Sequence, residues 1–242
     1  MFRLLKKLHL WFYVTEVCLY FFVLYPFLYY FSRKTSRFAR LNRVRRFLGF
    51  ISSATAGFFY SFSYEVPVDW SQTYIICPNH TSSLDISAIS VMISGNFAFM
   101  GKEELLKNPV TRLFFKTIDI PVNRNSKMSS FRAFKRAEDY LRQHISVVIF
   151  PEGKIDDTYP PVLNPFKNGP FRLAIEQQIP IIPVTIRNTW KKMWDNGFKY
   201  GSRPGICDIC VHKPISTSGL TVNDVDKLRE TVYQVIHKEF RA

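Results

Sequence analysis

The sequence predicts an α/β domain with a mainly parallel sheet flanked by helices, placed behind an N-terminal pair of apolar helices. From about residue 63 onward, short apolar stretches typical of buried strands alternate with longer stretches of helical periodicity. A chain of 242 residues is also long enough to bury one full core in such a domain. The first 62 residues differ in being apolar and basic. We therefore expect N-terminal membrane-associated helices over residues 1–62 and an α/β domain over residues 63–242.

The first apolar stretch, Leu8–Phe31, is interrupted only by a few polar groups and Pro26. As a helix it would run about 36 Å, enough to cross a hydrocarbon core of about 30 Å. It is too long for the core of a signal peptide, and no small-residue cleavage site follows it. This stretch is therefore predicted to be a membrane helix.

A second apolar stretch, Phe47–Phe62, is shorter and contains small residues that allow close helix packing. It is too short to span a bilayer well, and we expect it to be a partner helix. Two arrangements remain open: one spanning helix, or two helices that lie in one leaflet as a hairpin. Cations at both ends of the first helix suit the hairpin.

The formal net charge is +14, and most of it lies at the N-terminus. Residues 1–46 contain ten Lys or Arg and only one acid, Glu16. An anionic lipid surface attracts such a segment at about 1 kcal/mol per cation near the surface. Nucleic acid would not require the apolar stretch, so we expect membrane lipids and no nucleic acid as partners. The excess of cations in residues 33–46 predicts that the domain lies on the cytoplasmic face of the cell membrane.

The strands and helices of the domain follow from composition and periodicity. Five short apolar stretches are expected to be buried strands, namely Tyr74–Cys77, Asn96–Met100, Ser146–Phe150, Ile181–Ile186 and Ile206–Val211. Three stretches have helical patterns, namely Ser126–His144, Phe171–Gln177 and Asp224–Phe240. Strands that alternate with helices in this way favour a mainly parallel sheet.

The four cysteines do not form the pattern of a disulfide framework. Cys207 and Cys210 form a CxxC pair within the expected strand Ile206–Val211. Residues three apart on a strand point to opposite faces, so this pair predicts neither a zinc site nor a redox site. We interpret both cysteines as small core residues and predict no metal site.

A His and a carboxylate follow the first expected strand of the domain. Tyr74–Cys77 runs into Pro78, Asn79 and His80, and Asp85 comes five residues after the His in the first turn of a helix. A carboxylate that accepts from one ring nitrogen fixes the tautomer and leaves the other nitrogen free to take a proton. Two structural interpretations stay open: Ser82 and Asp85 also fit a helix capping box, and His80 could bond a loop.

The Asn79-His80…Asp85 pattern resembles the first signature of the glycerolipid acyltransferases, the PlsC-type family of lysophosphatidate acyltransferase. Further signatures follow in the order of that family over roughly residues 63–215. They are an acceptor-binding block in Gly101–Leu105 and Ile120–Arg124, a third motif in Phe150–Gly153 continued by Pro165–Gly169, and a proline-bearing strand in Ile179–Val184.

This resemblance implies a role for each matching residue. His80 would deprotonate the acceptor hydroxyl, which attacks the acyl thioester directly, and Asp85 would orient His80. The remaining matches imply substrate-binding residues: Lys102 and Arg124 would hold the acceptor phosphate, and Asn79, Glu152 and Gly153 would shape the site. The chemistry agrees, since a thiolate is a good leaving group and the acceptor alcohol is the group that needs activation.

One departure from the family bears on the acceptor. The family commonly continues its third motif with Thr and Arg, whereas Gly153 is followed here by Lys154 and Ile155. An ammonium supplies a point charge but not the two-pronged contact of a guanidinium. The acceptor is therefore less well defined than the reaction.

The sequence thus predicts an enzyme that moves an acyl group from acyl-CoA or acyl carrier protein to 1-acylglycerol 3-phosphate. The product would be phosphatidic acid, and no cofactor is required. Three alternatives stay open: an acyltransferase for another lipid acceptor, such as an aminoacyl or sugar lipid; a metal-dependent hydrolase with His80, Asp85 and Glu152 as ligands; and a basic membrane-surface binding module.

Overall fold

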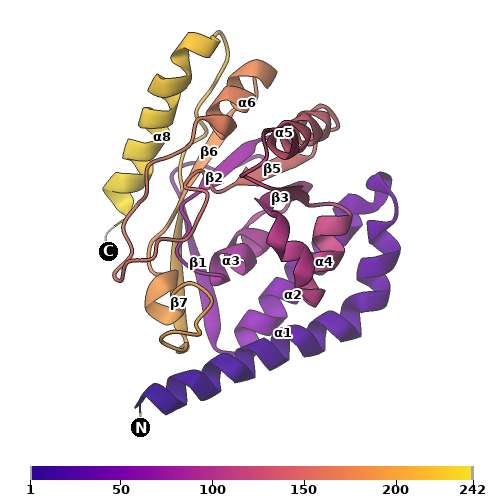
Figure 1. The fold of residues 1–242 in the computed structure, drawn as a ribbon, viewed down its shortest axis with the longest axis vertical. Coiled ribbons are helices and arrows are strands. Elements are labelled where there is room, and N and C mark those ends of the chain that lie inside the picture. Colours follow the sequence, from indigo (N-terminus) through magenta and orange to yellow (C-terminus); the bar gives the residue numbers. More distant parts are fainter. Residues whose placement is uncertain (1, 241–242) are drawn as a thin grey trace.

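The computed structural model describes residues 2–240, which form a seven-stranded sheet with helices on both faces (Figure 1). The strand order is β1-β7-β6-β2-β5-β3-β4. Every neighbouring pair is parallel except β6 and β7, so β1 and β7 run opposite to the other strands. The predicted α/β class with a mainly parallel sheet is confirmed.

The elements have the following bounds. The strands are β1 (Phe58–Tyr64), β2 (Ile75–Pro78), β3 (Phe97–Lys102), β4 (Ile120–Val122), β5 (Ser146–Ile149), β6 (Ile181–Ile186) and β7 (Gly205–Val211). The α-helices are α1 (Phe2–Ser32), α2 (Phe38–Thr55), α3 (Leu84–Met92), α4 (Pro109–Lys116), α5 (Lys127–Arg142), α6 (Gly169–Gln177), α7 (Thr189–Lys192) and α8 (Val225–Glu239). Short 3-10 helices are η1 (Thr35–Arg37), η2 (Glu103–Lys107) and η3 (Val222–Asp224).

The predicted helix over Phe47–Phe62 is wrong in its second half. Helix α2 starts earlier, at Phe38, and ends at Thr55, after which Gly57 takes a φ of 76° that favours glycine. The following Phe58–Tyr64 alternates aromatic residues with Ser and pairs in parallel with β7. Because that strand crosses residue 62, the sheet begins inside the segment that the sequence assigned to the membrane helices. Strand β4 is a second strand that the apolar stretches did not indicate.

The central strands are buried on both faces, which explains their continuous apolar runs. Neighbouring residues on a strand point to opposite faces, so Ile75 and Ile76 belong to different cores. Ile75 packs in the core that contains Val232 of α8 and Ala137 of α5. Ile76 packs in the core that contains Ile89 of α3.

Helix α1 lies along the domain rather than standing away from it (Figure 1). Near its start, His9 contacts the Ala56 carbonyl oxygen at 2.9 Å through Nε2 and the Ser202 hydroxyl at 2.7 Å through Nδ1. Farther along, Phe21 is buried against Phe114, and Leu28 is fully buried. Both halves of the helix therefore pack on the protein.

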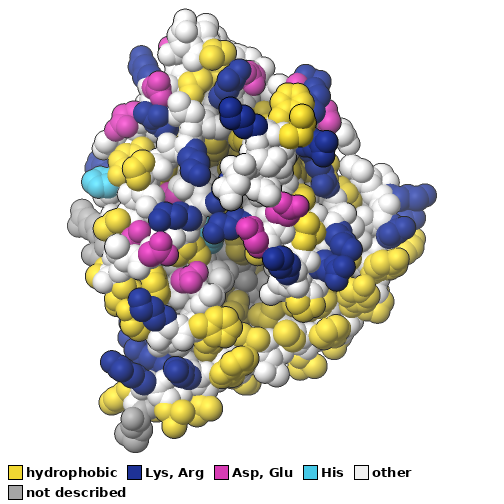
Figure 2. All heavy atoms as spheres, viewed as in Figure 1, with side chains coloured by type: hydrophobic (Ala, Val, Ile, Leu, Met, Phe, Trp, Pro, Cys, Tyr) yellow, Lys and Arg dark blue, Asp and Glu magenta, His cyan; other side chains and the backbone are white. Residues whose placement is uncertain are grey.

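The outer side of α1 is apolar. By length and composition α1 is the one described helix that could cross a membrane, and only 17% of its most apolar window is buried. Its exposed large apolar residues include Trp11, Phe12, Leu19, Phe22, Val23, Phe27 and Tyr30, and α2 adds Phe47 and Phe50. Figure 2 shows hydrophobic side chains along the side of the molecule where α1 lies. A helix that packs on the domain along its length suits the in-plane arrangement better than the spanning one.

A buried ion pair fixes α2 to the sheet. Arg45 Nη2 lies 3.0 Å from Asp119 Oδ1, both side chains are buried, and the same oxygen accepts from the Phe99 N–H. Burial raises the pKa of Asp119, and the Arg45 charge acts against that rise. A buried charge left without its partner is costly, so this pair holds α2 in one position on the sheet.

Candidate active site

The site is built at the carboxyl end of β2, where the chain turns into α3. His80 Nδ1 lies 2.9 Å from Asp85 Oδ2, and the Asp85 side chain is fully buried while His80 retains 18% exposure. The carboxylate accepts from Nδ1–H, which leaves Nε2 with a lone pair. The predicted His80–Asp85 pair therefore lies in the geometry of a general base and its orienting acid.

The Asp85 carboxylate is held from several sides. Oδ2 also accepts from the backbone N–H groups of Thr81 at 2.8 Å and Ser82 at 2.9 Å. Oδ1 accepts from the Thr189 hydroxyl at 2.6 Å, and Thr189 belongs to α7. The capping interpretation is thus partly correct, because Asp85 caps the turn before α3 and orients His80 with the same oxygen. Sequence reasoning missed Thr189, which lies 104 residues from Asp85 along the chain.

The imidazole ring is packed on one side and open at Nε2. It stacks on Phe150 with ring centroids 4.1 Å apart. Among residues 2–240, Nε2 has no hydrogen-bond partner. A ring fixed through Nδ1 and stacked on one side has little rotational freedom, so Nε2 is held in one direction for an incoming hydroxyl.

Glu152 acts on the main chain beside His80. Its Oε1 accepts from the His80 backbone N–H at 2.8 Å, and its Oε2 accepts from the Asn164 N–H at 2.8 Å and from Asn164 Nδ2 at 3.1 Å. Burial raises the pKa of Glu152, and the hydrogen bonds from Asn164 and His80 act against that rise. Glu152 therefore joins the His80 loop to the loop before α6.

Asn79 occupies a structural position. It is fully buried, its Nδ2 donates to the Ile186 carbonyl oxygen at 3.1 Å, and its Oδ1 accepts from the Ile186 N–H at 2.7 Å. Both ends of the amide are used to join the loop after β2 to the end of β6. The expected contact between Asn79 and substrate therefore has no support in this geometry.

Two cations meet at Gly153. A Cβ atom placed on this glycine would lie 3.1 Å from Lys167 Cε, 3.2 Å from Lys167 Nζ and 3.4 Å from Arg124 Nη1. Gly153 has a φ of 77°, so a glycine suits both the backbone and the space. Among residues 2–240, neither cation lies within ion-pair distance of a carboxylate. The Glu104 charge acts on Arg124 from beyond ion-pair distance, and two cations side by side without a carboxylate in ion-pair contact favour a bound anion.

The other predicted cations are placed differently. Lys102 ends β3 and is exposed; its backbone pairs with Val122, two residues before Arg124. Lys154 follows Gly153, but its ammonium points to Asp157 at 3.5 Å on the surface. Lys167 lies within Pro165–Gly169, the continuation of the third motif, and no role was predicted for it from the sequence. Figure 2 shows Lys and Arg side chains, with Asp and Glu side chains among them, around a hollow in the middle of this face.

The geometry does not favour the hydrolase alternative. Glu152 contacts the main chain of His80 rather than its ring, and Asp85 is saturated by hydrogen bonds. Within residues 2–240, ligand atoms of His80, Asp85 and Glu152 do not gather into a possible metal-binding group. Asp85 instead orients the His80 imidazole, and Glu152 holds the His80 main chain.

Comparison with known proteins agrees with this geometry. The model of the acyltransferase family matches residues 61–187, just over half of the chain. The chain belongs to the acyltransferase family. The matched segment of this acyltransferase contains His80, Asp85, Arg124, Glu152 and Lys167, so the family resemblance read from the sequence is confirmed.

Two relatives illustrate the similarity of this acyltransferase to curated proteins. It is 30% identical to 1-acyl-sn-glycerol-3-phosphate acyltransferase alpha of Mus musculus over 71% of this chain and 60% of that protein. It is 33% identical to an uncharacterized acyltransferase of Schizosaccharomyces pombe over 65% of this chain and 57% of that protein. The chain therefore spans less than two thirds of the length of these relatives.

A solved structure shares the fold of this acyltransferase. The crystal structure of the 1-acyl-sn-glycerophosphate acyltransferase PlsC from Thermotoga maritima matches with a TM-score of 0.74. The match covers 98% of this chain and 93% of that chain at 23% sequence identity. The coverage includes both α1 and α2, so the shared fold extends to the N-terminal helices.

Proposed function

We propose that this acyltransferase moves a fatty acyl group from an acyl thioester to the free hydroxyl of 1-acylglycerol 3-phosphate, which gives phosphatidic acid. The observation that carries the proposal is the buried Asp85 carboxylate 2.9 Å from His80 Nδ1, with Nε2 left free. Relatives named for this reaction support the choice of acceptor. Acyl-CoA or acyl carrier protein would carry the acyl group.

The chemistry follows from the tautomer that Asp85 selects. His80 Nε2 takes the proton of the acceptor hydroxyl while the hydroxyl oxygen attacks the carbonyl carbon of the thioester. The resulting imidazolium is stabilised by the Asp85 carboxylate at Nδ1. When the tetrahedral intermediate collapses, the C–S bond breaks and the thiolate leaves with the proton returned from Nε2. No covalent acyl-enzyme is needed.

The cations at Gly153 support a phosphate-bearing acceptor. Lys167 and Arg124 meet over Gly153, and the adjacent Glu152 bonds the His80 main chain. A molecule with a hydroxyl close to its phosphate can therefore reach the base and the cation pair together. We propose Lys167 as a phosphate-binding residue beside Arg124, in place of the arginine that the family commonly has after the third motif; Lys102 at the rim would add a further positive charge.

The apolar side of α1 and the N-terminal cations support attachment to a lipid surface. The exposed residues of α1 and α2 would enter one leaflet, and the Lys and Arg residues around them would meet anionic headgroups. This arrangement keeps the domain on one side, which we propose to be the cytoplasmic face of the cell membrane.

The decisive experiment offers labelled acyl-CoA and acyl carrier protein thioesters to the purified protein with a panel of lysolipids. We expect transfer to lysophosphatidate and much slower transfer to acceptors without a phosphomonoester. A second candidate is an acyltransferase for another lipid acceptor, which the departure at Lys154 favours. Equal use of an aminoacyl or sugar lipid in the same panel would support that candidate instead.

A further inference from the structure

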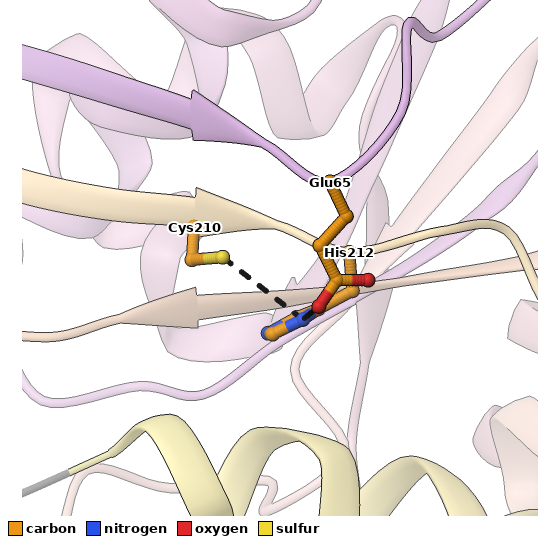
Figure 3. Close-up of side chains that lie close together, drawn as sticks. All are labelled: Glu65, Cys210 and His212. Atoms are coloured by element: carbon orange, nitrogen blue, oxygen red, sulfur yellow. Dashed lines mark hydrogen bonds and ion pairs between the residues drawn. The ribbon is translucent and has the colours of Figure 1, made fainter.

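A cluster of three potential metal ligands lies on β1 and β7, apart from the site at His80. Glu65, Cys210 and His212 each offer one ligand atom, and these atoms all lie within 4.8 Å of one another. Figure 3 shows the three side chains pointing toward one another across the ends of the two strands. Strand β6 separates β7 from β2, which precedes His80.

The strand register explains why these residues meet. Cys210 and His212 are two residues apart, so both point to the same face of the sheet. Ser63 pairs with Cys210 and Tyr64 with Val211, which places Glu65 at the end of β1 beside His212. The same alternation separates Cys207 from Cys210, as the sequence predicted: Cys207 points to the opposite face and packs in the core that contains Ile89. The chemical partner of Cys210 is His212.

The distances suit a zinc ion with small adjustments. His212 Nδ1 lies 2.7 Å from Glu65 Oε1 and 4.0 Å from Cys210 Sγ. Tetrahedral zinc with ordinary bond lengths holds a nitrogen and a sulfur about 3.6 Å apart, and a nitrogen and an oxygen about 3.4 Å apart. The carboxylate must therefore withdraw slightly, which its half-exposed side chain allows, and the sulfur must approach slightly.

The surroundings orient the cluster as a metal site requires. His212 Nε2 lies 2.8 Å from the Thr185 hydroxyl, so with its proton on Nε2 the ring would present the lone pair of Nδ1 to an ion. Glu65 Oε2 accepts from the Lys213 N–H at 2.8 Å, and Oε1 contacts His212 Nδ1 at 2.7 Å, so an ion would bind both atoms in place of the proton between them. Cys210 and His212 are buried, while 48% of the Glu65 side chain is exposed and offers a route from solvent.

The charge at the cluster is also compatible with a divalent cation. The positive charge of Arg187 acts on the Cys210 thiol. Arg187 is itself paired with Asp208 and Glu239, so its charge is largely balanced. Zinc would displace the thiol proton and form a neutral set of one thiolate, one carboxylate and one imidazole.

We infer that Glu65, Cys210 and His212 form a binding site for a zinc ion that joins the end of the edge strand β1 to β7. Water would fill the fourth position on the exposed side. The site lies on different strands from His80, so we assign it no part in acyl transfer. The ion would stabilise the fold by linking the end of the edge strand β1 to β7.

The test uses the full chain in detergent after metal removal by a chelator. Co²⁺ is added in steps and the absorption of the cobalt–thiolate charge-transfer band is followed, after which Zn²⁺ is titrated to displace it. We expect one equivalent of Co²⁺ per chain, full displacement by Zn²⁺, and a higher melting temperature with zinc than without it. A wild-type chain that gives no such band overturns the inference.

Variants assign the ligands. Cys210→Ser abolishes the band, and Glu65→Gln weakens Zn²⁺ binding by at least about 10-fold, since even residues behind the ligands contribute that much. Cys18→Ser, which removes the half-buried thiol of α1, leaves the band unchanged. If Cys210→Ser fails to fold, the half-exposed Glu65→Gln decides. An unchanged zinc affinity in Glu65→Gln, or the wild-type band in a folded Cys210→Ser chain, overturns the site.

Discussion

The Thr189 hydroxyl donates a 2.6 Å hydrogen bond to Asp85 Oδ1, on the carboxylate whose other oxygen orients His80. Both Thr189 and Asp85 are fully buried. Thr189 also lies 3.2 Å from the Thr81 hydroxyl, so α7 holds the His80 loop at two points. Thr189 is therefore a positioning residue that acts through Asp85.

This relationship gives the first prediction, for Thr189→Val. The carboxylate loses one charge-assisted hydrogen bond, which is worth about 1.5–3 kcal/mol, so kcat should fall by about 10-fold or more. Thr189→Ser keeps the hydroxyl and should recover most of the activity. The measurement is kcat and KM for both variants, with the pH profile of kcat/KM. A merely structural role is indicated if Val and Ser variants have equal kcat and unshifted pH profiles.

The second prediction concerns the base itself. His80→Ala should lower kcat by about 10²–10⁴, the usual contribution of a general base. Asp85→Asn should lower kcat in the same direction, because the tautomer and the imidazolium lose their support. His80 is partly exposed, so the Ala variant should fold, as circular dichroism can verify. Near wild-type turnover in a folded His80→Ala chain would contradict the mechanism.

Most strands of the sheet and the His80–Asp85 pair could be predicted from the sequence. Strands β2, β5 and β6 are continuous apolar runs buried on both faces, and such runs are recognisable in the sequence. Strand β1 was missed because Phe58–Tyr64 follows an apolar helix directly, and its alternation of aromatic residues with Ser was absorbed into that helix. His80 and Asp85 are local to one turn and therefore recognisable together.

The parts that could not be predicted depend on contacts between distant segments. Ser63 meets Ile209 across 146 residues, and only the strand order brings Glu65 to His212. Lys167 had a visible motif around it, but its approach to Arg124 depends on how two loops fold over Gly153. Lys154, the nearer residue in sequence, points away to Asp157.

The third prediction separates the transferase from a metal-dependent hydrolase. Acyl transfer should survive EDTA at temperatures well below the melting temperature, because His80 supplies the base. The neighbouring carboxylates of Asp85 and Glu152 are used in hydrogen bonds. The assay compares rates before and after chelation, with folding monitored in parallel. Activity lost from a folded chain and restored by one divalent metal would favour the hydrolase.

The fourth prediction tests membrane attachment. Wild type should stay on anionic lipid vesicles through a high-salt wash, because apolar burial is not screened as charge attraction is. Removal of residues 1–62 is a poor test, since it also removes most of β1 and the buried Leu28 and Leu41. The double variant Phe22→Asp with Phe27→Asp changes only exposed side chains of α1 and should be released.

Val222→Asp is the matched control for this experiment, because Val222 is similarly exposed but lies in η3, away from α1 and α2. It should remain bound. Flotation on a density gradient measures all three proteins. Salt-released wild type, or equal binding of the double variant and wild type, would show that the apolar side of α1 does not enter the lipid.

The fifth prediction concerns the acceptor phosphate. Lys167→Ala and Arg124→Ala should each raise KM for lysophosphatidate by about 10- to 150-fold, since each removes a charge-assisted hydrogen bond worth roughly 1.5–3 kcal/mol. KM for the acyl donor should change much less. Arg124→Lys should be only partly tolerated, because an ammonium cannot reproduce a bidentate contact. Initial rates over a range of both substrates separate the two KM values.

Lys154→Ala provides the matched control for the acceptor. Lys154 lies one residue from Gly153 but faces Asp157 on the surface, so its removal should leave KM for lysophosphatidate within about twofold, as expected for an exposed ion pair. Lys102→Ala removes an exposed cation at the end of β3 and should have a smaller effect than Lys167→Ala, because Lys102 does not approach Gly153 as Lys167 does. If Lys154→Ala raises KM as strongly as Lys167→Ala, the effect is one of general charge rather than of a built phosphate site. If none of these variants changes KM, the cation pair at Gly153 does not bind the acceptor phosphate, and the acceptor is a different lipid.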